Sequence, residues 1–424
     1  MSTTNIEPTP ANNTAADRTA PPAPDVAADG SKEAIGLPLF GGLKIGWNTL
    51  LTTLPIYIGL IAIWLYFNSQ TDGKFIGARN LSEMFQEYSY KPILAIGVVF
   101  VLLLGEIDLS LGYLTLLSTT IAAQLSANLH WAAGAAILGA VAVCTALGLV
   151  QGFFIAWVRM PAFVVTLGGF LIFEGIAYHL VGGATINVFD PFIDSLGTTY
   201  LSNAVGLGVA TAAVIAYVLY ALNGRRHRTR AGLTNPPIAR FVATAVALAV
   251  LLEGVVALIN TYRGVPLSLA LLGLFAVIFW FFARRLPFGR HIYAVGGNLE
   301  AARRAGINTT AVRWIVFGIS GLMAGIAGVL LVGYGQAAST TSAGPDLLLD
   351  VISIAVIGGV SLTGGKGSVW AVLLGGLVVA SVDSGLNLMS TDPNFVYVIK
   401  GAILLLAILI DVVGKRRGGL AIRR

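Results

Sequence analysis

Twelve apolar runs follow one another along this chain, and they constrain its fold more than any other feature. A membrane-spanning helix needs ~20 predominantly apolar residues, and 56% of the 424 residues are hydrophobic while only 11% are charged. A soluble domain carries roughly 25% charged residues, so a soluble fold of this length would lack polar groups to cover its surface. We predict an all-α, polytopic transmembrane helix bundle with spans at 47–67, 92–104, 111–127, 132–157, 162–181, 204–222, 238–260, 267–283, 312–333, 347–360, 367–388 and 395–412.

Two of these runs are too short for a full crossing. Runs 92–104 and 347–360 hold fewer than the ~17 residues that a span requires. Irregular backbone is tolerated at membrane depth only where protein or a water-filled cavity surrounds it. Each short run is therefore a candidate half-helix that ends inside the protein.

The scarce basic residues lie almost entirely on alternate connections between the runs. If the N-terminal tail is cytoplasmic, 21 of the 26 Lys and Arg residues fall on cytoplasmic segments, and the outer segments hold only Lys74, Arg79, Lys91 and Arg263. Because cytoplasmic loops retain positive charge, we predict that both termini are cytoplasmic. Topology then explains the net charge of +6, and no nucleic-acid partner is expected.

The domain organisation follows from the same runs. Residues 1–45 hold proline, alanine and scattered acids without periodicity, so they bury too little apolar surface to fold and are expected to form a disordered cytoplasmic tail. Residues 46–413 are predicted to form one transmembrane domain in membrane lipid, and 414–424 a basic cytoplasmic tail. Inside the domain, Gly148 with Gly152 and Gly321 with Gly325 have the four-residue spacing that favours close helix crossings.

Four acidic residues fall within or near apolar runs. Asp350 and Asp383 lie near predicted run ends, which leaves Glu174 and Glu253 as the candidates for a position deep in the membrane. A carboxylate at the centre of a span costs ~2.5–3.5 kcal/mol on insertion scales and should face the bundle interior. Glu174 is a candidate residue of a transport path. The alternative is that these acids hydrogen-bond to neighbouring helices or water.

No enzymatic signature is complete in this chain. The string around Lys366 resembles a phosphate-binding P-loop, but that motif needs glycine at position 360 and Ser or Thr at 367, where the chain has Val360 and Gly367. The four histidines are too scattered for metal-ligand spacing. We therefore expect no catalytic residue, no metal site and no cofactor bound by this chain.

The basic connection 284–311 predicts a capped surface helix. Gly296 and Gly297 are expected to form a turn, Asn298 an N-cap, and Gly306 the C-terminal stop. Acidic and basic residues at 300, 303 and 304 suit the dipole of this helix. Alanines beside the arginines provide a small-residue face on which a protein could dock. The alternative is an ordinary basic loop that its charge holds on the inner side.

Two octapeptides form a candidate internal repeat. Residues 105–112, Gly-Glu-Ile-Asp-Leu-Ser-Leu-Gly, align with residues 358–365, Gly-Gly-Val-Ser-Leu-Thr-Gly-Gly, and each follows one of the short runs. We interpret them as a cytoplasmic gate or a helix-breaking hinge. Two alternatives stay open: a chance similarity in a glycine-rich chain, and simple N-capping of span 111–127 by Asp108 or Ser110. The predicted gate or hinge comprises Gly105, Glu106, Asp108, Ser110, Gly358, Gly359, Ser361, Gly364 and Gly365.

These motifs together resemble those of a known family, the permease subunits of bacterial ABC importers for monosaccharides such as ribose, arabinose and xylose. The resemblance rests on 105–112, on 289–298 with Gly306, on 358–368 and, more weakly, on 161–168. Glu106 stands where ribose-type members tend to have glycine, which favours the xylose-type branch. Family members usually have about ten membrane helices, so the resemblance marks 204–260 as an additional hairpin.

The resemblance implies a division of labour between subunits of the bacterial inner membrane. Two copies of the permease would form the path, an external sugar-binding protein would deliver the sugar, and a separate ATP-binding subunit would hold ATP-Mg. That subunit would dock on Gly289, Arg290, Gly296, Gly297, Asn298, Glu300, Ala301, Ala302, Arg303, Arg304 and Gly306.

The sequence therefore predicts a permease subunit, not an enzyme, that passes a monosaccharide inward, a pentose such as xylose. The first alternative is a self-contained secondary sugar carrier driven by protons through Glu174 and Glu253. The second is a membrane scaffold or receptor without transport. Neither the sugar nor the residues that contact it follow from the sequence.

Overall fold

The computed structural model describes residues 47–420, with side chains for 56–406, 408 and 409. The predicted tail 1–45 and residues 421–424 lie outside this part of the chain. The predicted basic tail from 414 onward continues the last helix as far as residue 420. The helices are α1 (Trp47–Gln70), α2 (Ala78–Tyr88), α3 (Tyr90–Leu103), α4 (Leu111–Ala123), α5 (Ala133–Ala156), α6 (Ala162–Val181), α7 (Pro191–Thr198), α8 (Asn203–Arg230), α9 (Ile238–Ile259), α10 (Leu267–Arg285), α11 (Pro287–Gly297), α12 (Leu299–Arg304), α13 (Thr309–Gly335), α14 (Pro345–Ile357), α15 (Ala371–Leu388) and α16 (Pro393–Leu420).

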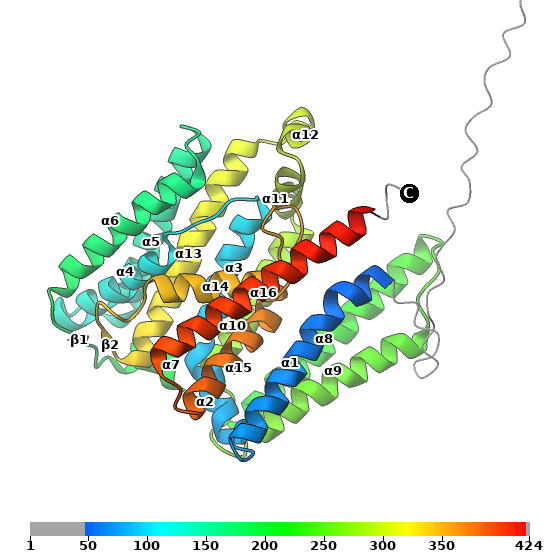
Figure 1. The fold of residues 1–424 in the computed structure, drawn as a ribbon, viewed down its shortest axis with the longest axis horizontal. Coiled ribbons are helices and arrows are strands. Elements are labelled where there is room, and N and C mark those ends of the chain that lie inside the picture. Colours follow the sequence, from blue (N-terminus) through cyan, green and yellow to red (C-terminus); the bar gives the residue numbers. More distant parts are fainter. Residues whose placement is uncertain (1–46, 421–424) are drawn as a thin grey trace, which may run out of the picture. The chain divides into compact units, whose positions relative to one another are not determined.

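Every predicted apolar run lies in a helix over most of its length, so the all-α membrane bundle is confirmed. Within the described residues, seven helices are long and apolar enough to cross a membrane: α5, α6, α8, α9, α10, α13 and α15. A five-residue π-helical turn, Gln124–Asn128, continues α4. The described part of the chain has two short strands, β1 (Ile186–Asn187) and β2 (Ala337–Ala338), which pair antiparallel. They and α7 lie at the end of the bundle away from α11 and α12 (Figure 1).

The half-helix prediction is confirmed for one short run and wrong for the other. α14 has 13 residues, which at 1.5 Å per residue is about 20 Å and too short for the ~30 Å hydrocarbon core. α3 is also short, but α2 leads directly into it. The only residue between them, Ser89, keeps a helical backbone at φ −63° and ψ −27°. Run 92–104 is therefore the second half of a nearly continuous helical stretch.

α4 and α14 begin beside each other in the interior of the bundle. A Cβ placed on Gly112, in the first turn of α4, would lie 2.2 Å from the carbonyl oxygen of Gly344, the residue before α14. Ser320, which hydrogen-bonds to the segment leading into α4, lies about three turns into α13, or roughly 16 Å along its axis. The helix formed by run 111–127 thus begins in the interior of the bundle, which the length of the run did not indicate.

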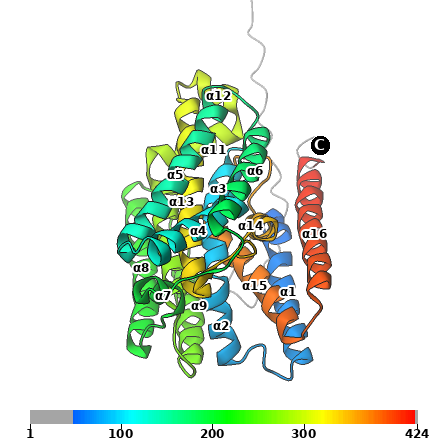
Figure 2. The same ribbon diagram turned by 90° about the vertical axis from the view of Figure 1, so that its left-hand side faces the viewer.

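α13 is the central helix of the bundle and packs against α5, α3 and α4 (Figure 2). Glycines let the α5 and α13 backbones touch: a Cβ on Gly148 would lie 2.4 Å from the Phe317 carbonyl oxygen, and one on Gly321 would lie 2.3 Å from that of Cys144. The predicted close crossing is confirmed. It fixes α13, and with it the connection that precedes α13, relative to the core.

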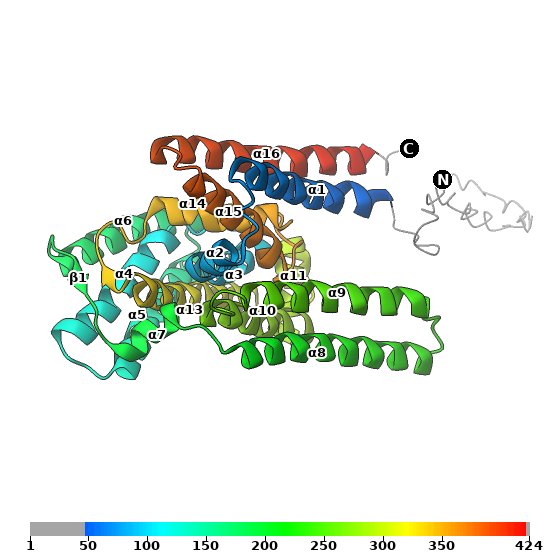
Figure 3. The ribbon, with the colours of Figure 1, turned by 90° about the horizontal axis from the view of Figure 1, so that it is seen from below.

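The predicted hairpin 204–260 corresponds to α8 and α9, which lie side by side along one edge of the bundle (Figure 3). Most of their side chains are exposed. Val256 and Ile259 of α9 are buried in a cluster with Leu81 and Met84 of α2. Ala210 of α8 belongs to the same cluster. The hairpin thus joins the core through both helices and leaves its remaining apolar surface free for lipid or protein.

Candidate functional site

The connection between α10 and α13 contains two helices, where the sequence predicted one. α11 lies tightly against α10, because a Cβ on Gly289 would lie 2.3 Å from the Ala283 carbonyl oxygen. Gly296 and Gly297 are the last residues of α11, so their prediction as a turn is wrong. The chain leaves the helix one residue later, at Asn298, whose backbone is extended with φ −161° and ψ 103°.

α12 is the predicted capped helix. The side chain of Asn298 accepts a hydrogen bond from the Ala301 amide at 2.9 Å, which satisfies one of the amides that a helix start leaves unpaired. Glu300 in the first turn and Arg304 in the last form an exposed ion pair at 3.3 Å. Gly306 follows with a φ of +79°, the left-handed conformation expected of a helix stop. The caps and the charge pattern read from the sequence are therefore confirmed.

The two sides of α12 have different environments. Ala302 is 4% exposed and packs into the core, so it cannot belong to a docking face as predicted. Ala301, Arg303 and Arg304 are exposed. Arg303 Nε also donates to Thr309 Oγ1 at 3.2 Å, which ties α12 to the first turn of α13. The outward face of α12 thus carries two guanidinium groups on a helix whose position is fixed.

α11 contributes a further exposed base and one polar contact with the core. Arg290 is exposed, and the Tyr293 hydroxyl donates to the Gly367 carbonyl oxygen at 3.0 Å. Burial raises the pKa of Tyr293, although the Arg284 guanidinium, 5.3 Å from the ring centroid, acts in the opposite direction. The phenol therefore remains protonated and donates this hydrogen bond at neutral pH.

Three motifs that are far apart in the sequence meet where α11 ends. A Cβ on Gly296 would lie 1.7 Å from the Leu103 carbonyl oxygen, and that same oxygen accepts from the Gly365 amide at 2.9 Å. A Cβ on Gly364 would lie 2.8 Å from the Gly296 carbonyl oxygen and 2.9 Å from the Gly105 amide nitrogen. We call Leu103, Gly105, Gly296, Gly364 and Gly365 the glycine junction. Its backbones are in direct contact, so the predicted docking connection and both predicted gate motifs form one packed unit.

The first gate motif is held by its polar side chains. Glu106, three residues after the end of α3, forms an ion pair with Arg313 in the first turns of α13. Asp108 accepts from the Ser110 amide at 3.0 Å and from the Ser110 hydroxyl at 2.6 Å, and its other oxygen accepts from Ser320 at 3.1 Å. Neither Asp108 nor Ser110 caps α4 through its side chain. The N-capping alternative is therefore wrong, and the motif links α3 and α4 to α13.

The second gate motif is a tight loop between α14 and α15. A Cβ on Gly358 would lie 2.2 Å from the Ala371 carbonyl oxygen, and Gly359 has a φ of +95°. The Ser361 amide donates to the Lys366 carbonyl oxygen at 2.9 Å, which closes the loop. This loop carries Gly364 and Gly365 into the glycine junction, so the position of α14 depends on that junction.

The two acids predicted to lie deep make similar contacts on different helices. Glu174 on α6 is half-buried and accepts a hydrogen bond from the Tyr113 hydroxyl on α4 at 2.7 Å. Glu253 on α9 is also half-buried and accepts from Thr211 on α8 at 2.6 Å. α6 and α9 lie on opposite sides of the bundle (Figure 3). The hydrogen-bonded alternative is thus observed for both acids.

Sequence reasoning missed a buried cluster of four charges, the charge quartet of Lys91, Asp350, Asp383 and Lys400. Lys91 Nζ on α3 lies 2.6 Å from an Asp350 oxygen on α14 and 2.8 Å from an Asp383 oxygen on α15. Lys400 on α16 contacts the other oxygen of each at 3.1 and 2.7 Å. The two lysines and two aspartates of the charge quartet have a formal net charge of zero. The placement of Lys91 in an outer loop is therefore wrong, and both aspartates, although near the ends of their runs, are buried in the bundle.

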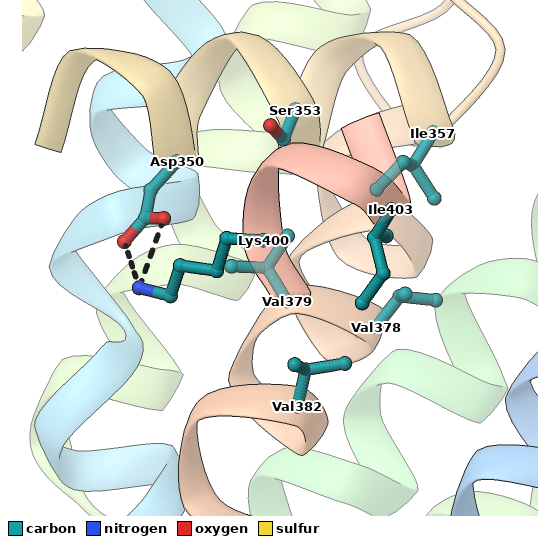
Figure 4. A pocket seen from close by; sticks show the side chains of 8 residues that line it. All are labelled: Asp350, Ser353, Ile357, Val378, Val379, Val382, Lys400 and Ile403. Carbon is teal, nitrogen blue, oxygen red and sulfur yellow. Dashed lines mark hydrogen bonds and ion pairs between the residues drawn. The ribbon is translucent and has the colours of Figure 1, made fainter. Parts of the chain in front are cut away.

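The quartet borders a small cavity of about 20 Å³ between α14, α15 and α16, into which Lys400 extends toward Asp350 (Figure 4). The other side chains that line this cavity are Ser353, Ile357, Val378, Val379, Val382 and Ile403. The signal available in the sequence was that Lys91 adjoins an apolar run and Lys400 lies within one, as Asp350 and Asp383 do. Opposite charges in that setting are expected to pair.

The fold and these contacts define a polytopic α-helical membrane protein with a capped helix at one end of its bundle. A family model described as "branched-chain amino acid transport system / permease component" matches residues 87–408. The chain belongs to this family of transport-system permeases.

Several characterised permeases resemble the chain over most of its length. The xylose transport system permease protein XylH of Escherichia coli K12 is 37% identical over 387 residues, which cover 91% of this chain and 98% of XylH. XylH of Haemophilus influenzae is 37% identical over 86% of this chain and 98% of its own length. The ribose import permease protein RbsC of Escherichia coli K12 is more distant, at 29% identity over 80% of this chain and 87% of RbsC. No solved structure matches the chain.

Proposed function

We propose that this chain is the transmembrane subunit of an ATP-driven importer that passes a monosaccharide, a pentose such as xylose, into the cytoplasm of a bacterium. Its working partners would be a second copy of the chain, a cytoplasmic ATP-binding subunit that carries ATP-Mg, and an extracytoplasmic sugar-binding protein. The distribution of basic residues supports a cytoplasmic location for both termini and for α12. The names of the xylose and ribose permeases support the sugar class.

The observation that carries this proposal is the path of contacts from α12 to α14. α12 presents Arg303 and Arg304 outward, and α11, which precedes it, ends in the glycine junction. Because the junction consists of touching backbones, a displacement of α12 cannot be absorbed by side-chain rotation. Such a displacement must also move the end of α3 and the loop after α14. Closure of ATP-bound partner subunits against α12 would thus move the half-helix and switch access between the two sides of the membrane.

Uptake by membrane vesicles tests the energy source. We expect inward xylose flux only when the ATP-binding subunit, ATP and the sugar-binding protein are all present. Flux driven by a pH gradient without ATP would instead establish the secondary-carrier alternative, and the absence of flux under both conditions would favour a scaffold or receptor.

Charge reversal tests the docking surface. Arg303→Glu with Arg304→Glu should abolish co-purification of the ATP-binding subunit, because the exposed positive face of α12 is inverted. The matched control is Arg226→Glu with Arg230→Glu, an exposed pair at the end of α8, which should leave co-purification intact. Normal assembly and normal uptake in the α12 variant would refute docking at this helix.

A further inference from the structure

One face of the bundle, formed by α6, α14 and α16, carries polar and aromatic side chains at the depth where α4 and α14 begin. These helices lie along the same side in Figure 3. We call Tyr113, Glu174, Tyr178, Asp346 and Tyr397 the polar row. Its members come from α4, α6, α14 and α16.

The first part of the row is an aromatic corner that holds a carboxylate. Tyr113 donates its hydroxyl proton to Glu174 at 2.7 Å. The Tyr113 ring meets Phe170 edge-on at a centroid distance of 4.6 Å and Tyr178 at 6.2 Å. Tyr178 is 39% exposed, and Glu174 is partly exposed. A molecule on this face therefore meets a carboxylate beside an aromatic ring.

The second part of the row lies where α14 starts. The Tyr397 hydroxyl donates to Asp346 at 2.8 Å, and both side chains are exposed. Gly344, two residues before Asp346, joins the two parts. A Cβ built on Gly344 would lie 4.0 Å from the Tyr113 hydroxyl oxygen. The two carboxylate–phenol pairs are thus neighbours across the beginning of α14.

Tyr178, Asp346 and Tyr397 are exposed and Glu174 is partly exposed, whereas Tyr113 is buried. We infer from the two carboxylates that water, and not lipid, covers this part of the face. Charged side chains in membrane-spanning segments are costly and almost always face a bundle interior or a water-filled cavity. Elsewhere, α6 exposes apolar side chains, including Leu171 at 61% and Ile172 at 58%. A hydrated polar row between apolar surfaces is expected if this face and a second copy of the chain enclose an aqueous path.

We propose that the polar row is a sugar-contacting site within the translocation path. This inference rests on the proposed function and adds the residues that meet the substrate. A monosaccharide presents hydroxyl donors around a ring whose C–H groups are slightly positive. Glu174 and Asp346 accept from hydroxyls, the phenols of Tyr113 and Tyr397 orient those carboxylates, and the exposed Tyr178 ring offers its electron-rich face to the C–H groups. The contacts are few, which suits a site that must release its sugar.

Uptake measured together with ATP hydrolysis tests the carboxylates. Glu174→Gln and Asp346→Asn remove the negative charges and retain side-chain size. We expect each to reduce ATP-driven xylose uptake at least tenfold while ATP hydrolysis stimulated by the binding protein stays within twofold of wild type. The matched control is Glu253→Gln, a carboxylate on α9 that also accepts one hydroxyl hydrogen bond, and it should change neither quantity more than twofold.

Two outcomes would overturn the site. One is uptake within twofold of wild type in both variants. The other is a parallel loss of uptake and ATP hydrolysis, which would place the defect in assembly rather than in sugar contact. A wild-type protein that shows no ATP-dependent uptake would contradict the proposed function itself.

Cysteine labelling tests the site without any partner subunit. The native chain has one cysteine, Cys144, and it is buried. In membranes, we expect Tyr178→Cys to react with a charged, membrane-impermeant maleimide at least tenfold faster than Leu219→Cys, a position on α8 that is 62% exposed. D-xylose should slow the reaction at 178. It should not change the reaction rate of Thr341→Cys, an exposed reference position on the loop before α14. Equal rates at 178 and 219, or no protection by D-xylose at 178, would refute the site even if ATP-driven uptake is established.

Discussion

The charge quartet makes a quantitative prediction about stability. Lys91→Met removes one of two cations that hold two carboxylates, whose side chains are only 7% and 5% exposed. Breaking a buried ion pair costs about 3–5 kcal/mol, because the remaining charge stays buried without its partner. Lys400, with a side chain 24% exposed, still contacts both carboxylates. We therefore expect the lower end of that range, about 3 kcal/mol of the free energy of unfolding.

A double-mutant cycle separates this charge imbalance from lost packing. Lys91→Met with Asp350→Asn leaves one cation and one anion, Lys400 and Asp383, in contact at 2.7 Å. The double variant should therefore be more stable than the sum of the single losses predicts, with a coupling energy of about 2 kcal/mol. If the double variant loses as much free energy of unfolding as the two single variants together, the electrostatic reasoning is wrong.

Unfolding in detergent micelles, followed by tryptophan fluorescence during titration with a denaturing detergent, measures these free energies. Lys74→Met is the control, since Lys74 is exposed and surface substitutions usually change stability by no more than about 0.5 kcal/mol. A Lys91→Met variant within about 1 kcal/mol of wild type would show that the quartet does not stabilise the position of α14.

Three further predictions concern backbone contacts and a cap. Gly148→Ala should lower the free energy of unfolding by about 1–3 kcal/mol, because the new Cβ meets the α13 backbone. The control Gly175→Ala places its Cβ in open space and should change the free energy of unfolding little. Equal effects of the two substitutions would contradict the close crossing. Gly296→Ala should reduce ATP-driven uptake more than tenfold with the ATP-binding subunit still bound, while its neighbour Gly297→Ala, with nothing within 4 Å of the new Cβ, should retain uptake. Asn298→Ala should lower the stability of α12 by about 1 kcal/mol. Amide hydrogen exchange should then be roughly fivefold faster across α12 and unchanged in α13. Unchanged exchange in α12 would exclude the capping role of Asn298.

Local features of the sequence were sufficient to predict the helices and the caps of α12. A run of ~20 apolar residues can satisfy its backbone in lipid only as a helix, so run lengths predicted the bundle directly. The cap at Asn298 involves atoms only three residues apart, which is why its spacing alone identified it. The sequence also predicted a close helix crossing at each of the two glycine pairs, because the four-residue spacing lies within one helix; only the structure shows that the two pairs meet.

Contacts between distant segments could not be predicted in this way. Nothing near Lys91 in the sequence indicates that its partners are Asp350 and Asp383, 259 and 292 residues further along. Position near a run end did not indicate that both aspartates are buried, since a short helix such as α14 can begin inside the bundle.

The sequence by itself thus determined a helical membrane protein with a capped basic segment, because spans and caps arise from hydrophobic length and from hydrogen bonds within one turn. Only the tertiary structure decided that this segment, through Gly296, touches both gate motifs, and that four charges from four helices neutralise one another. The physical reason is that steric contact and Coulomb attraction depend on distance in space, which the packing of helices sets and their order along the chain does not.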